Sequence, residues 1–372
     1  MKNGKNLGLV LLPLTLTLGI VGGIFIGRVM NTRKLSPAQE KWAALLSLID
    51  EEYVDDVDVD SLLENSIPDL LAHLDPHSAY IAKSNLSAVN EELDNSFSGI
   101  GVKFQIVSDS VVVSEVIAGG PAEKVGLQPG DRIVSANGKS LTGDTLTNDR
   151  VFKTLRGAKG TKALLKVKRY NSRKLLSFDV IRADIPVNSV DAVYMAAPRI
   201  GYLRVSKFGN GTYDEFFNAL TSLQSQGADK FIVDLRGNTG GFMDQAIYMA
   251  NEFLPKGNMI VYSKGRVPIN ETVAVADGNG SFQNSEITVL IDEYSASASE
   301  IFAGAIQDND RGLVVGRRSF GKGLVQNQAV LPDSSAIRLT VARYYTPSGR
   351  CIQKDYKRGA DGRYDLDILE RY

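Results

Sequence analysis

The stretch 230-KFIVDLRGNTGGFMDQAIYMANEFL-254 contains a β-strand, a glycine-rich turn and an α-helix in direct succession. Its first part is an apolar run of strand length, and the part from Phe242 onward has apolar side chains at helical spacing. The same strand-then-helix order is repeated on both sides of it, in 200-IGYLRVSKF-208, 213-YDEFFNALTSLQSQG-227, 287-ITVLIDE-293 and 298-ASEIFAGAIQDN-309. Strands that alternate with helices predict an α/β core with a largely parallel sheet, covered on both faces. In such a core, ligand sites lie in the loops that follow the strands.

A second module precedes this core. Residues 97–183 contain short β segments separated by turn residues, and one short helix in 119-GGPAEKVGLQPGD-131. This pattern predicts a compact, independent β-rich domain. The core then covers residues 184–355, and residues 356–372 form a polar tail.

The N-terminal part of the chain predicts a membrane anchor followed by helices. Residues 6–27 carry no charge, and roughly 20 apolar residues suffice to span a bilayer. A cleaved signal peptide is the alternative, but it would have a shorter apolar stretch and a small-residue cleavage site. We therefore expect a single-pass anchor within residues 1–34, in the cytoplasmic membrane, although the flanking charges do not set its orientation. Residues 35–96 are expected to be helical, with Trp42, Leu45, Leu46 and Ile49 on one face, as a packing or dimerisation element that makes a homodimer worth testing.

The composition excludes several classes of function. The net charge is −1, which does not favour a nucleic-acid partner. Cys351 is the only cysteine, and His73 and His77 are the only histidines. Neither a disulfide nor a multi-cysteine metal site is available, and we expect no metal and no cofactor.

The segment 316-GRRSFGKG-323 invites comparison with a phosphate-binding loop, but three observations disfavour nucleotide binding. The residue after Lys322 is Gly323, where the motif needs a hydroxyl to bind magnesium. The following residues lack the apolar stripe of a helix whose N-terminus would face the phosphates. The acidic strand 289-VLIDE-293 also precedes this loop, which is the reverse of the usual chain order.

Ser297 stands at the start of a predicted helix that begins near Ala298. Free amides and the positive end of the helix dipole favour negative charge there, as an oxyanion requires. The fragment Ser297-Ala298-Ser299-Glu300 also fits a capping box, which is the commonest reason for a serine at this place. From this fragment alone, both interpretations remain open.

A serine nucleophile needs a base, and the scarcity of histidine favours a lysine in that role. A Ser–His–Asp triad would have to draw on the helical N-terminal region. Lys322 lies among Phe320, Leu324 and Val325, where burial would lower its pKa from about 10.4 and allow it to accept a proton. The turn 234-DLRGNTGG-241 could supply a second oxyanion donor from the amide of Gly240 or Gly241, or it could be an ordinary tight connection.

These motifs together resemble the carboxyl-terminal processing peptidases, or tail-specific proteases. The resemblance covers roughly residues 70–355 and includes LDPHSAYI, FSGIGVKF, DLRGNTGG, YSASASEIFAGAIQDN, SFGKGLVQ and YYTPSGRCIQ. It implies a core similar to the crotonase and Clp protease group, with residues 97–183 as a PDZ domain. By motif position, it implies Ser297 as nucleophile, Lys322 as general base and Gln326 as the residue that holds the lysine. It also implies an oxyanion hole from Ala298 and a glycine of Gly240-Gly241, and an accessory acidic position at Asp308.

The PDZ resemblance implies a second binding site. Gly99, Ile100, Gly101 and Val102 resemble the loop whose amides bind the terminal carboxylate of a peptide, which then adds as a strand. The implied function is a serine endopeptidase that recognises free C-termini of unstructured proteins and cleaves upstream, with its catalytic part in the periplasm. The alternatives are an inactive PDZ scaffold or adaptor, or an amidase or acyl-transferring enzyme with the same core fold.

Overall fold

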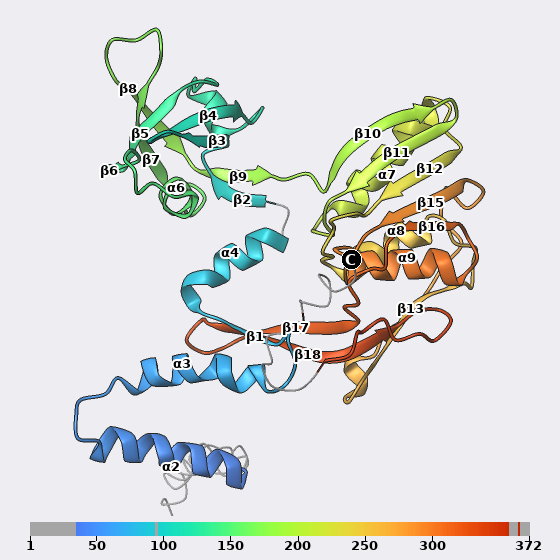
Figure 1. The fold of residues 1–372 in the computed structure, drawn as a ribbon, viewed down its shortest axis with the longest axis horizontal. Helices are drawn as coiled ribbons and strands as arrows, with labels where there is room; N and C mark the ends of the chain where they lie inside the picture. The colour runs from blue at the N-terminus through green and yellow to red at the C-terminus, as the bar shows by residue number, and fades with distance from the viewer. Residues whose placement is uncertain (1–34, 94–95, 357–363, 365–372) are drawn as a thin grey trace, which may run out of the picture. The chain divides into compact units, whose positions relative to one another are not determined.

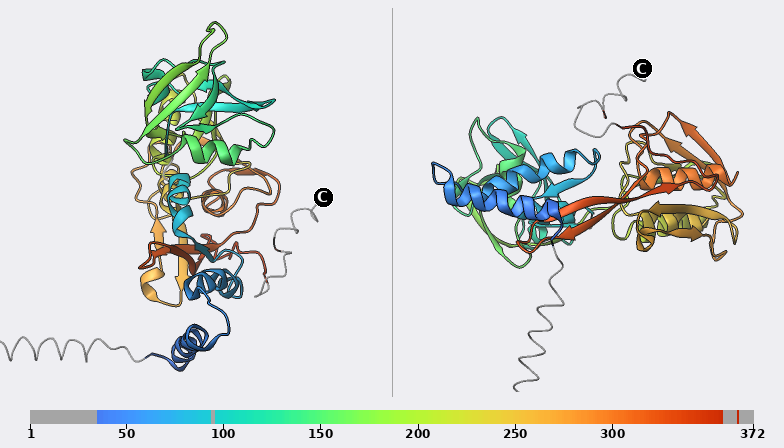
Figure 2. Two further views of the ribbon diagram at one scale, coloured as in Figure 1. Left: turned by 90° about the vertical axis from the view of Figure 1, so that its left-hand side faces the viewer. Right: turned by 90° about the horizontal axis from the view of Figure 1, so that it is seen from below.

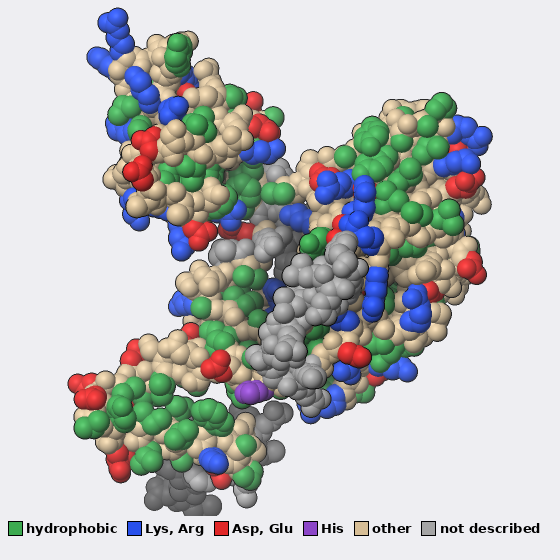
Figure 3. Space-filling model, viewed as in Figure 1, with side chains coloured by type: hydrophobic (Ala, Val, Ile, Leu, Met, Phe, Trp, Pro, Cys, Tyr) green, Lys and Arg blue, Asp and Glu red, His purple; other side chains and the backbone are tan. Residues whose placement is uncertain are grey.

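The structure is a computed structural model that describes residues 35–93, 96–356 and 364. The chain divides into two compact units between Ile67 and Pro68. The first contains α2 (Pro37–Glu52), which starts at a Ser36–Gln39 capping box, and most of α3 (Val59–Ala72). No residue of α2 is buried, and apolar side chains gather on its visible face (Figure 3). A homodimer through this face stays a prediction.

The localisation expected from the sequence is corrected by the structure. Among the described residues, no helix combines the length and the apolar character needed to cross a membrane. Residues 6–27, on which the expectation of a single-pass anchor and a periplasmic catalytic part rested, lie outside the described residues. The sequence argument used apolar length alone, which does not establish a spanning helix.

The larger unit contains a five-stranded sheet in the order β10-β11-β12-β15-β16 (Figure 1). Its strands are β10 (Val190–Ala197), β11 (Ile200–Val205), β12 (Lys230–Asp234), β15 (Glu286–Ile291) and β16 (Leu313–Gly316). The pairs from β11 to β16 are parallel, as the sequence predicts, and only β10 is antiparallel to its neighbour.

Three helices cover one face of this sheet. They are α7 (Thr212–Ser225), α8 (Met243–Asn251) and α9 (Ala298–Asp308), and their apolar residues share one core with alternate residues of the strands. The residues on the other sheet face, such as Tyr202 and Thr288, are only half-buried. The expectation of helices on both faces is therefore wrong. The physical reason is the strand order: every crossover runs in the same direction, and right-handed crossovers then place all helices on one side.

A second, antiparallel sheet follows the order β1-β18-β13-β14, and β17 pairs with β18. Its strands are β1 (Ala79–Ile81), β13 (Met259–Gly265), β14 (Val273–Val275), β17 (Leu324–Val330) and β18 (Ala336–Tyr345). Figure 2 shows the long strand β18, in red, from two further directions. Because β17 is a strand, the loop before Lys322 does not open a helix, and the structure excludes a phosphate-binding loop there.

The β-rich module has its own apolar core. Its sheet runs β3-β4-β5-β7-β8, with β6 paired to β5. These elements are β3 (Val102–Val107), β4 (Ser110–Val116), β5 (Arg132–Ala136), β6 (Lys139–Ser140), β7 (Lys162–Lys168) and β8 (Leu176–Ile181), with helices α5 (Pro121–Lys124) and α6 (Asn148–Leu155). A two-stranded ribbon of β2 (Ser96–Gly99) and β9 (Ala183–Pro186) joins the two chain ends of the module. The helix α4 (Lys83–Leu93) precedes β2.

Candidate active site

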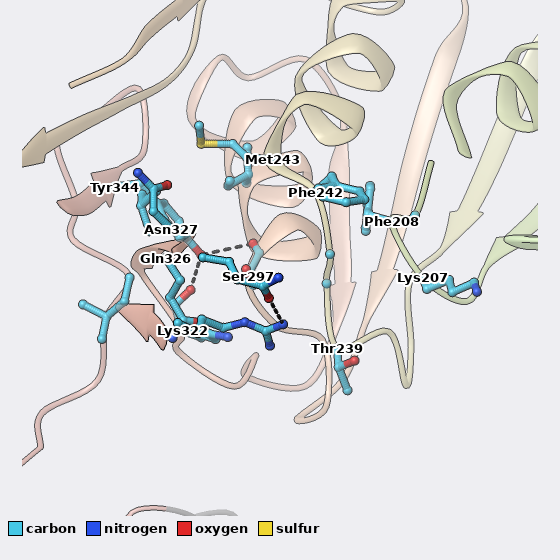
Figure 4. A pocket seen from close by; sticks show the side chains of 18 of the residues that line it. Lys207, Phe208, Thr239, Phe242, Met243, Ser297, Lys322, Gln326, Asn327 and Tyr344 are labelled. Atoms are coloured by element: carbon cyan, nitrogen blue, oxygen red, sulfur yellow. Dashed lines mark hydrogen bonds between the residues drawn. The ribbon is translucent and has the colours of Figure 1, made fainter. Parts of the chain in front are cut away.

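Three loops that follow adjacent parallel strands meet at one cavity. The loop after β12 carries Gly240 and Gly241, the loop after β15 ends at Ser297, and the loop after β16 carries Lys322. The carboxyl ends of parallel strands lie at the same edge of a sheet, so these loops converge. All four residues line a cavity of about 550 Å³, together with Gln326 and Tyr344 (Figure 4).

Ser297 has a strained main chain at the start of α9. Its φ is 56° and its ψ is −113°, which lies outside the extended region that a serine cap normally adopts. The carboxylate of Glu300 accepts the Ser297 amide at 2.8 Å, which is the reciprocal half of the capping box. Ser297 therefore belongs to a helix cap and also has the position at the helix start that suits a reactive hydroxyl. Ala298 is buried, and its amide, as the first of the helix, has no hydrogen-bond partner among the described residues.

Lys322 lies half-buried in the same cavity. Burial lowers its pKa, and the positive charge of Arg338 lowers it further, while Asp75 and Glu300 act in the opposite direction. Within the part of the chain that the structure describes, its Nζ makes no hydrogen bond or ion pair. These are the conditions under which a lysine amine becomes available as a base.

Gly240 packs directly against Ser297, and Gly241 packs against Phe208. A Cβ on Gly240, whose φ is +101°, would lie 2.7 Å from Ser297 Cβ and 3.0 Å from the Ala298 amide nitrogen. The amide of Gly240 already donates to Asn238 Oδ1 at 2.8 Å. The amide of Gly241 has no partner among the described residues. Of the two glycines, Gly241 therefore has the amide that remains available for an oxyanion.

Glu300 joins the serine loop to the lysine loop. Its Oε2 accepts the amides of Ser297 and Lys322, both at 2.8 Å. Its Oε1 accepts the Gly321 amide and the Ser319 hydroxyl, both at 2.7 Å. Burial raises the pKa of Glu300, and these four donors oppose that effect. Sequence reasoning identified Glu300 only as part of a cap, and no signal in the sequence indicates its contacts with the lysine loop.

The hydroxyl of Tyr344 makes a second link between the same two loops. It donates to the carbonyl of Ser297 at 3.1 Å and also contacts the carbonyl of Lys322. Tyr344 is buried, and burial raises its pKa well above the usual value. Sequence reasoning did not find this residue.

Gln326 lies on β17, four residues after the lysine. Its side-chain amide donates to the carbonyl of His77. The segment around His77 is held by Asp75, which accepts the hydroxyl of Ser78 at 2.6 Å and that of Thr340 at 3.1 Å. Gln326 thus connects the cavity to the segment before β1, and its role in holding Lys322 stays a prediction. Neither histidine of the chain is among the described residues that line the cavity.

Asp308 lies at the other end of α9 from Ser297. It accepts the Ser348 hydroxyl at 2.5 Å and forms an ion pair with Arg350 at 2.5 Å. These hydrogen bonds lower its pKa against the effect of burial. Asp308 does not line the cavity. Its contacts with Ser348 and Arg350 hold the turn after β18.

The loop from Gly99 to Val102 lies between β2 and β3 of the β-rich module. Ile100 is buried and Gly101 has a φ of +79°. Their carbonyls accept the amides of Ala122 and Ile117, but their own amides have no partner among the described residues. Two free amides in such a turn are suited to bind a carboxylate.

Comparison with known proteins identifies both parts of the chain. Residues 199–360 match the peptidase family S41, and residues 112–169 match the PDZ domain. A probable CtpA-like serine protease of Staphylococcus aureus (strain N315) is 34% identical over 346 residues, which cover 91% of this chain and 68% of the relative. The chain belongs to peptidase family S41.

A second sequence relative, CtpB, agrees with this assignment. The carboxy-terminal processing protease CtpB of Bacillus subtilis (strain 168) is 35% identical over 328 residues, which cover 85% of this chain and 66% of CtpB. The solved structure of a photosystem II D1 C-terminal processing protease is 28% identical, covers 88% of this chain and 92% of its own, and gives a TM-score of 0.47. This S41 protein is a serine-type peptidase with a PDZ domain, which confirms the predicted family, fold class and enzyme class.

Proposed function

We propose that this S41 peptidase is an endopeptidase that uses Ser297 as its nucleophile and Lys322 as its general base. The observation that carries the proposal is the shared cavity, in which both side chains lie beside the free amides of Ala298 and Gly241. A half-buried lysine with a lowered pKa matches what a general base needs near neutral pH.

In the first step, the neutral Lys322 amine accepts the Ser297 hydroxyl proton as Ser297 Oγ bonds to the carbonyl carbon of the substrate. The carbonyl oxygen becomes an oxyanion, which the amides of Ala298 and Gly241 stabilise. When the tetrahedral intermediate collapses, the peptide C–N bond breaks. The leaving amine takes the proton from the lysine ammonium.

In the second step, water attacks the acyl-enzyme ester and Lys322 accepts its proton. Collapse of this intermediate releases the new carboxyl terminus and returns the proton to Ser297. Glu300 and Tyr344 hold the two loops in register through both steps, because each bonds to both of them. Gln326 is proposed to position the lysine.

The PDZ domain is proposed to bind the free C-terminus of an unstructured protein. The support is the pair of free amides at Ile100 and Gly101, in a loop with Gly99 and Val102 at its ends. A bound terminus would add as a strand to the module, and the chain upstream of it would reach the protease. A scaffold without activity has less support, because it does not account for the lowered pKa of Lys322.

The test uses the full chain and an unfolded protein substrate with an apolar C-terminus, with the products identified by mass spectrometry. Ser297→Ala, Lys322→Ala and Lys322→Arg should each abolish cleavage, since a guanidinium does not give up its proton. Lys256→Ala is the matched control, because Lys256 is exposed and lies outside the cavity. Cleavage that persists in a folded Ser297 or Lys322 variant refutes the dyad.

Recognition of the C-terminus has a separate test. A peptide substrate with a C-terminal carboxylate is compared with the same peptide ending in an amide. The free carboxylate should give the higher kcat/KM, because only its charge makes strong hydrogen bonds to the loop amides. Equal values for the two peptides contradict PDZ recognition and leave the dyad untouched.

A further inference from the structure

The segment that follows β18 packs along the lysine loop. The amide of Gly323 donates to Gln353 Oε1 at 2.9 Å. The amide of Lys354 donates to the carbonyl of Gly321 at 2.9 Å. A Cβ on Gly323 would lie 2.6 Å from the main-chain nitrogen of Gln353, so the two segments are in close contact. Both neighbours of Lys322 in the chain are therefore held by this segment.

Tyr364 binds this segment from further along the chain. The Lys354 ammonium lies 4.0 Å from the ring centroid of Tyr364 and 4.0 Å from that of Phe320, which belongs to the lysine loop. The two rings meet edge to face, with centroids 5.9 Å apart. Lys354 Nζ also donates to the carbonyl of Tyr364 at 2.7 Å, and Gln353 Nε2 donates to its hydroxyl at 2.9 Å. Tyr364 thus contacts the lysine loop directly through Phe320 and indirectly through the segment after β18.

The same hydroxyl contacts His77. It lies 2.8 Å from His77 Nε2, and the two rings meet edge to face with centroids 5.0 Å apart. Because Gln353 already donates to this hydroxyl, its proton is available for His77 Nε2. The His77 amide donates to Asp75 Oδ1 at 2.8 Å, and the His77 carbonyl accepts the side-chain amide of Gln326. Tyr364 therefore fixes the side chain of the residue that holds Gln326.

These contacts form a closed path around Lys322. On one side, the path runs from the lysine loop to the segment after β18 and on to Tyr364. On the other side, it runs from Tyr364 through His77 to Gln326. Lys322 and Gln326 both line the cavity (Figure 4). Tyr364 joins the two sides, and it lies outside residues 199–360, which match the S41 family.

We propose that Tyr364 is a positioning residue for the general base, which closes this path and keeps Lys322 in place beside Ser297. The inference rests on the proposed dyad and names a residue that holds it. Tyr364 is not among the described residues that line the cavity. It therefore acts through Gln353 and His77, and not on the substrate.

The lysine loop needs this support because a glycine stands on each side of the lysine. Gly321 has a φ of +92°, and glycine loses more conformational freedom on folding than any other residue. Such a loop keeps one conformation only where contacts from outside fix it. Glu300 and Tyr344 supply contacts from the serine loop side, as described above, and Tyr364 supplies them through the segment after β18.

The first test compares two substitutions at Tyr364 in the full chain. Tyr364→Phe removes the hydroxyl and keeps the ring, whereas Tyr364→Ala removes both. With the peptide substrate, we expect kcat to fall about three- to tenfold in Tyr364→Phe and about 10- to 100-fold in Tyr364→Ala. KM should stay within about twofold, because a general base acts in the chemical step. Tyr356→Phe is the matched control: its ring centroid lies 6.4 Å from that of Tyr364, but its hydroxyl contacts Arg343.

The second test observes Lys322 without any cleavage. Competitive labelling of amines with acetic anhydride over a pH series, read by mass spectrometry, gives the pH midpoint at which Lys322 loses its proton. Burial lowers the pKa of Lys322, and a loosened loop lets water reach the amine, so the midpoint should move to higher pH in both Tyr364 variants. Arg338, Asp75 and Glu300, whose charges act on Lys322, are unchanged in them. The midpoint should not move in Tyr356→Phe, and a loss of overall stability alone does not move it.

A double variant tests the route through His77. His77→Phe removes the partner of the Tyr364 hydroxyl and keeps a ring at that position. If the hydroxyl acts through His77, the combined variant His77→Phe with Tyr364→Phe should lose less kcat than the product of the two single losses. Losses that multiply fully overturn this route and the proposal with it.

The results separate the positioning role from the proposed function. If the unmodified protein does not cleave the peptide but the Lys322 midpoint moves in the Tyr364 variants, the proposed function fails and the hold on Lys322 is supported. If it cleaves the peptide and Tyr364→Ala keeps both kcat and the midpoint, the function stands and the positioning role is refuted. A higher KM with an unchanged kcat and midpoint assigns Tyr364 to substrate binding and also overturns the proposal.

Discussion

Replacement of Glu300 by alanine should destabilise the protease core and disable it at the same time. The carboxylate accepts three main-chain amides and one hydroxyl, from Ser297, Gly321, Lys322 and Ser319. A buried donor without a partner costs about 1–3 kcal/mol. The hydroxyl can rotate to another acceptor, so the three amides set a gross loss of about 3–9 kcal/mol.

Two effects reduce this loss. The variant no longer buries a carboxylate, and water can enter the space that the side chain leaves. We therefore expect the free energy of unfolding of the core to fall by about 3–5 kcal/mol, as for other broken buried networks. Glu300→Gln should lower the free energy of unfolding by about half as much. The side-chain oxygen of the glutamine keeps two of the four donors, whereas its NH2 group, itself a donor, faces the other two. Release of both loops should lower kcat about 100-fold in Glu300→Ala, since small shifts at reacting atoms are costly.

Calorimetry of the full chain, followed at the core transition, measures the stability, and peptide cleavage gives kcat. Glu286→Ala is the matched control, because Glu286 is an exposed residue of β15 and its loss should cost less than about 0.5 kcal/mol. Amide exchange at Ser297 and Lys322 reports directly on the two released amides. If Glu300→Ala is as stable as the control and keeps its activity, the carboxylate does not hold the loops together.

Three further changes give separate tests. Gly240→Ala places a Cβ 2.7 Å from Ser297 Cβ at a φ of +101°. It should lower the free energy of unfolding, measured by chemical denaturation, by about 2–4 kcal/mol and abolish cleavage. An active variant of normal stability contradicts the packing. The proposed general base Lys322 would be active only when neutral, so cleavage should rise with pH through a pKa below its usual 10.5. Arg338→Gln, which removes one cause of the lowering, should move that rise to higher pH, and an unmoved pH profile refutes the coupling. Asp131→Ala removes the carboxylate that accepts two 2.7 Å bonds from an arginine, and should lower the PDZ transition in calorimetry by about 2–3 kcal/mol while the core transition stays in place.

Most of the core elements could be predicted from the sequence, because their apolar periodicity is strong. The segment 298–309 has buried residues at helical spacing and forms α9, and the run 230–236 forms β12. The strands β1 and β10 were not predicted. β10 is exposed or half-buried along its length, and β1 has three residues of which only Ile81 is buried, so neither shows the alternation on which such predictions depend.

The residues that line the candidate site could be predicted where a local feature marks them, and could not where long-range contacts bring them together. Ser297, Lys322 and the glycine pair stand out because a helix start, an isolated lysine and a turn are local features. The contacts of Glu300 with the lysine loop join residues 19–22 positions apart, and those of Tyr344 with Ser297 span 47. No spacing rule connects such residues before the fold is known.

The ribbon of β2 and β9 has a consequence for how this enzyme can be altered. Gly99 pairs with Ala183, so the chain enters and leaves the PDZ module at neighbouring points. A foreign recognition domain whose termini lie close together could replace the PDZ module there, or a short turn could join Gly99 to Ala183 directly. Neither change would lengthen the chain within the protease core. If the PDZ module selects the substrate as proposed, substrate selection and peptide-bond cleavage could then be altered independently of each other.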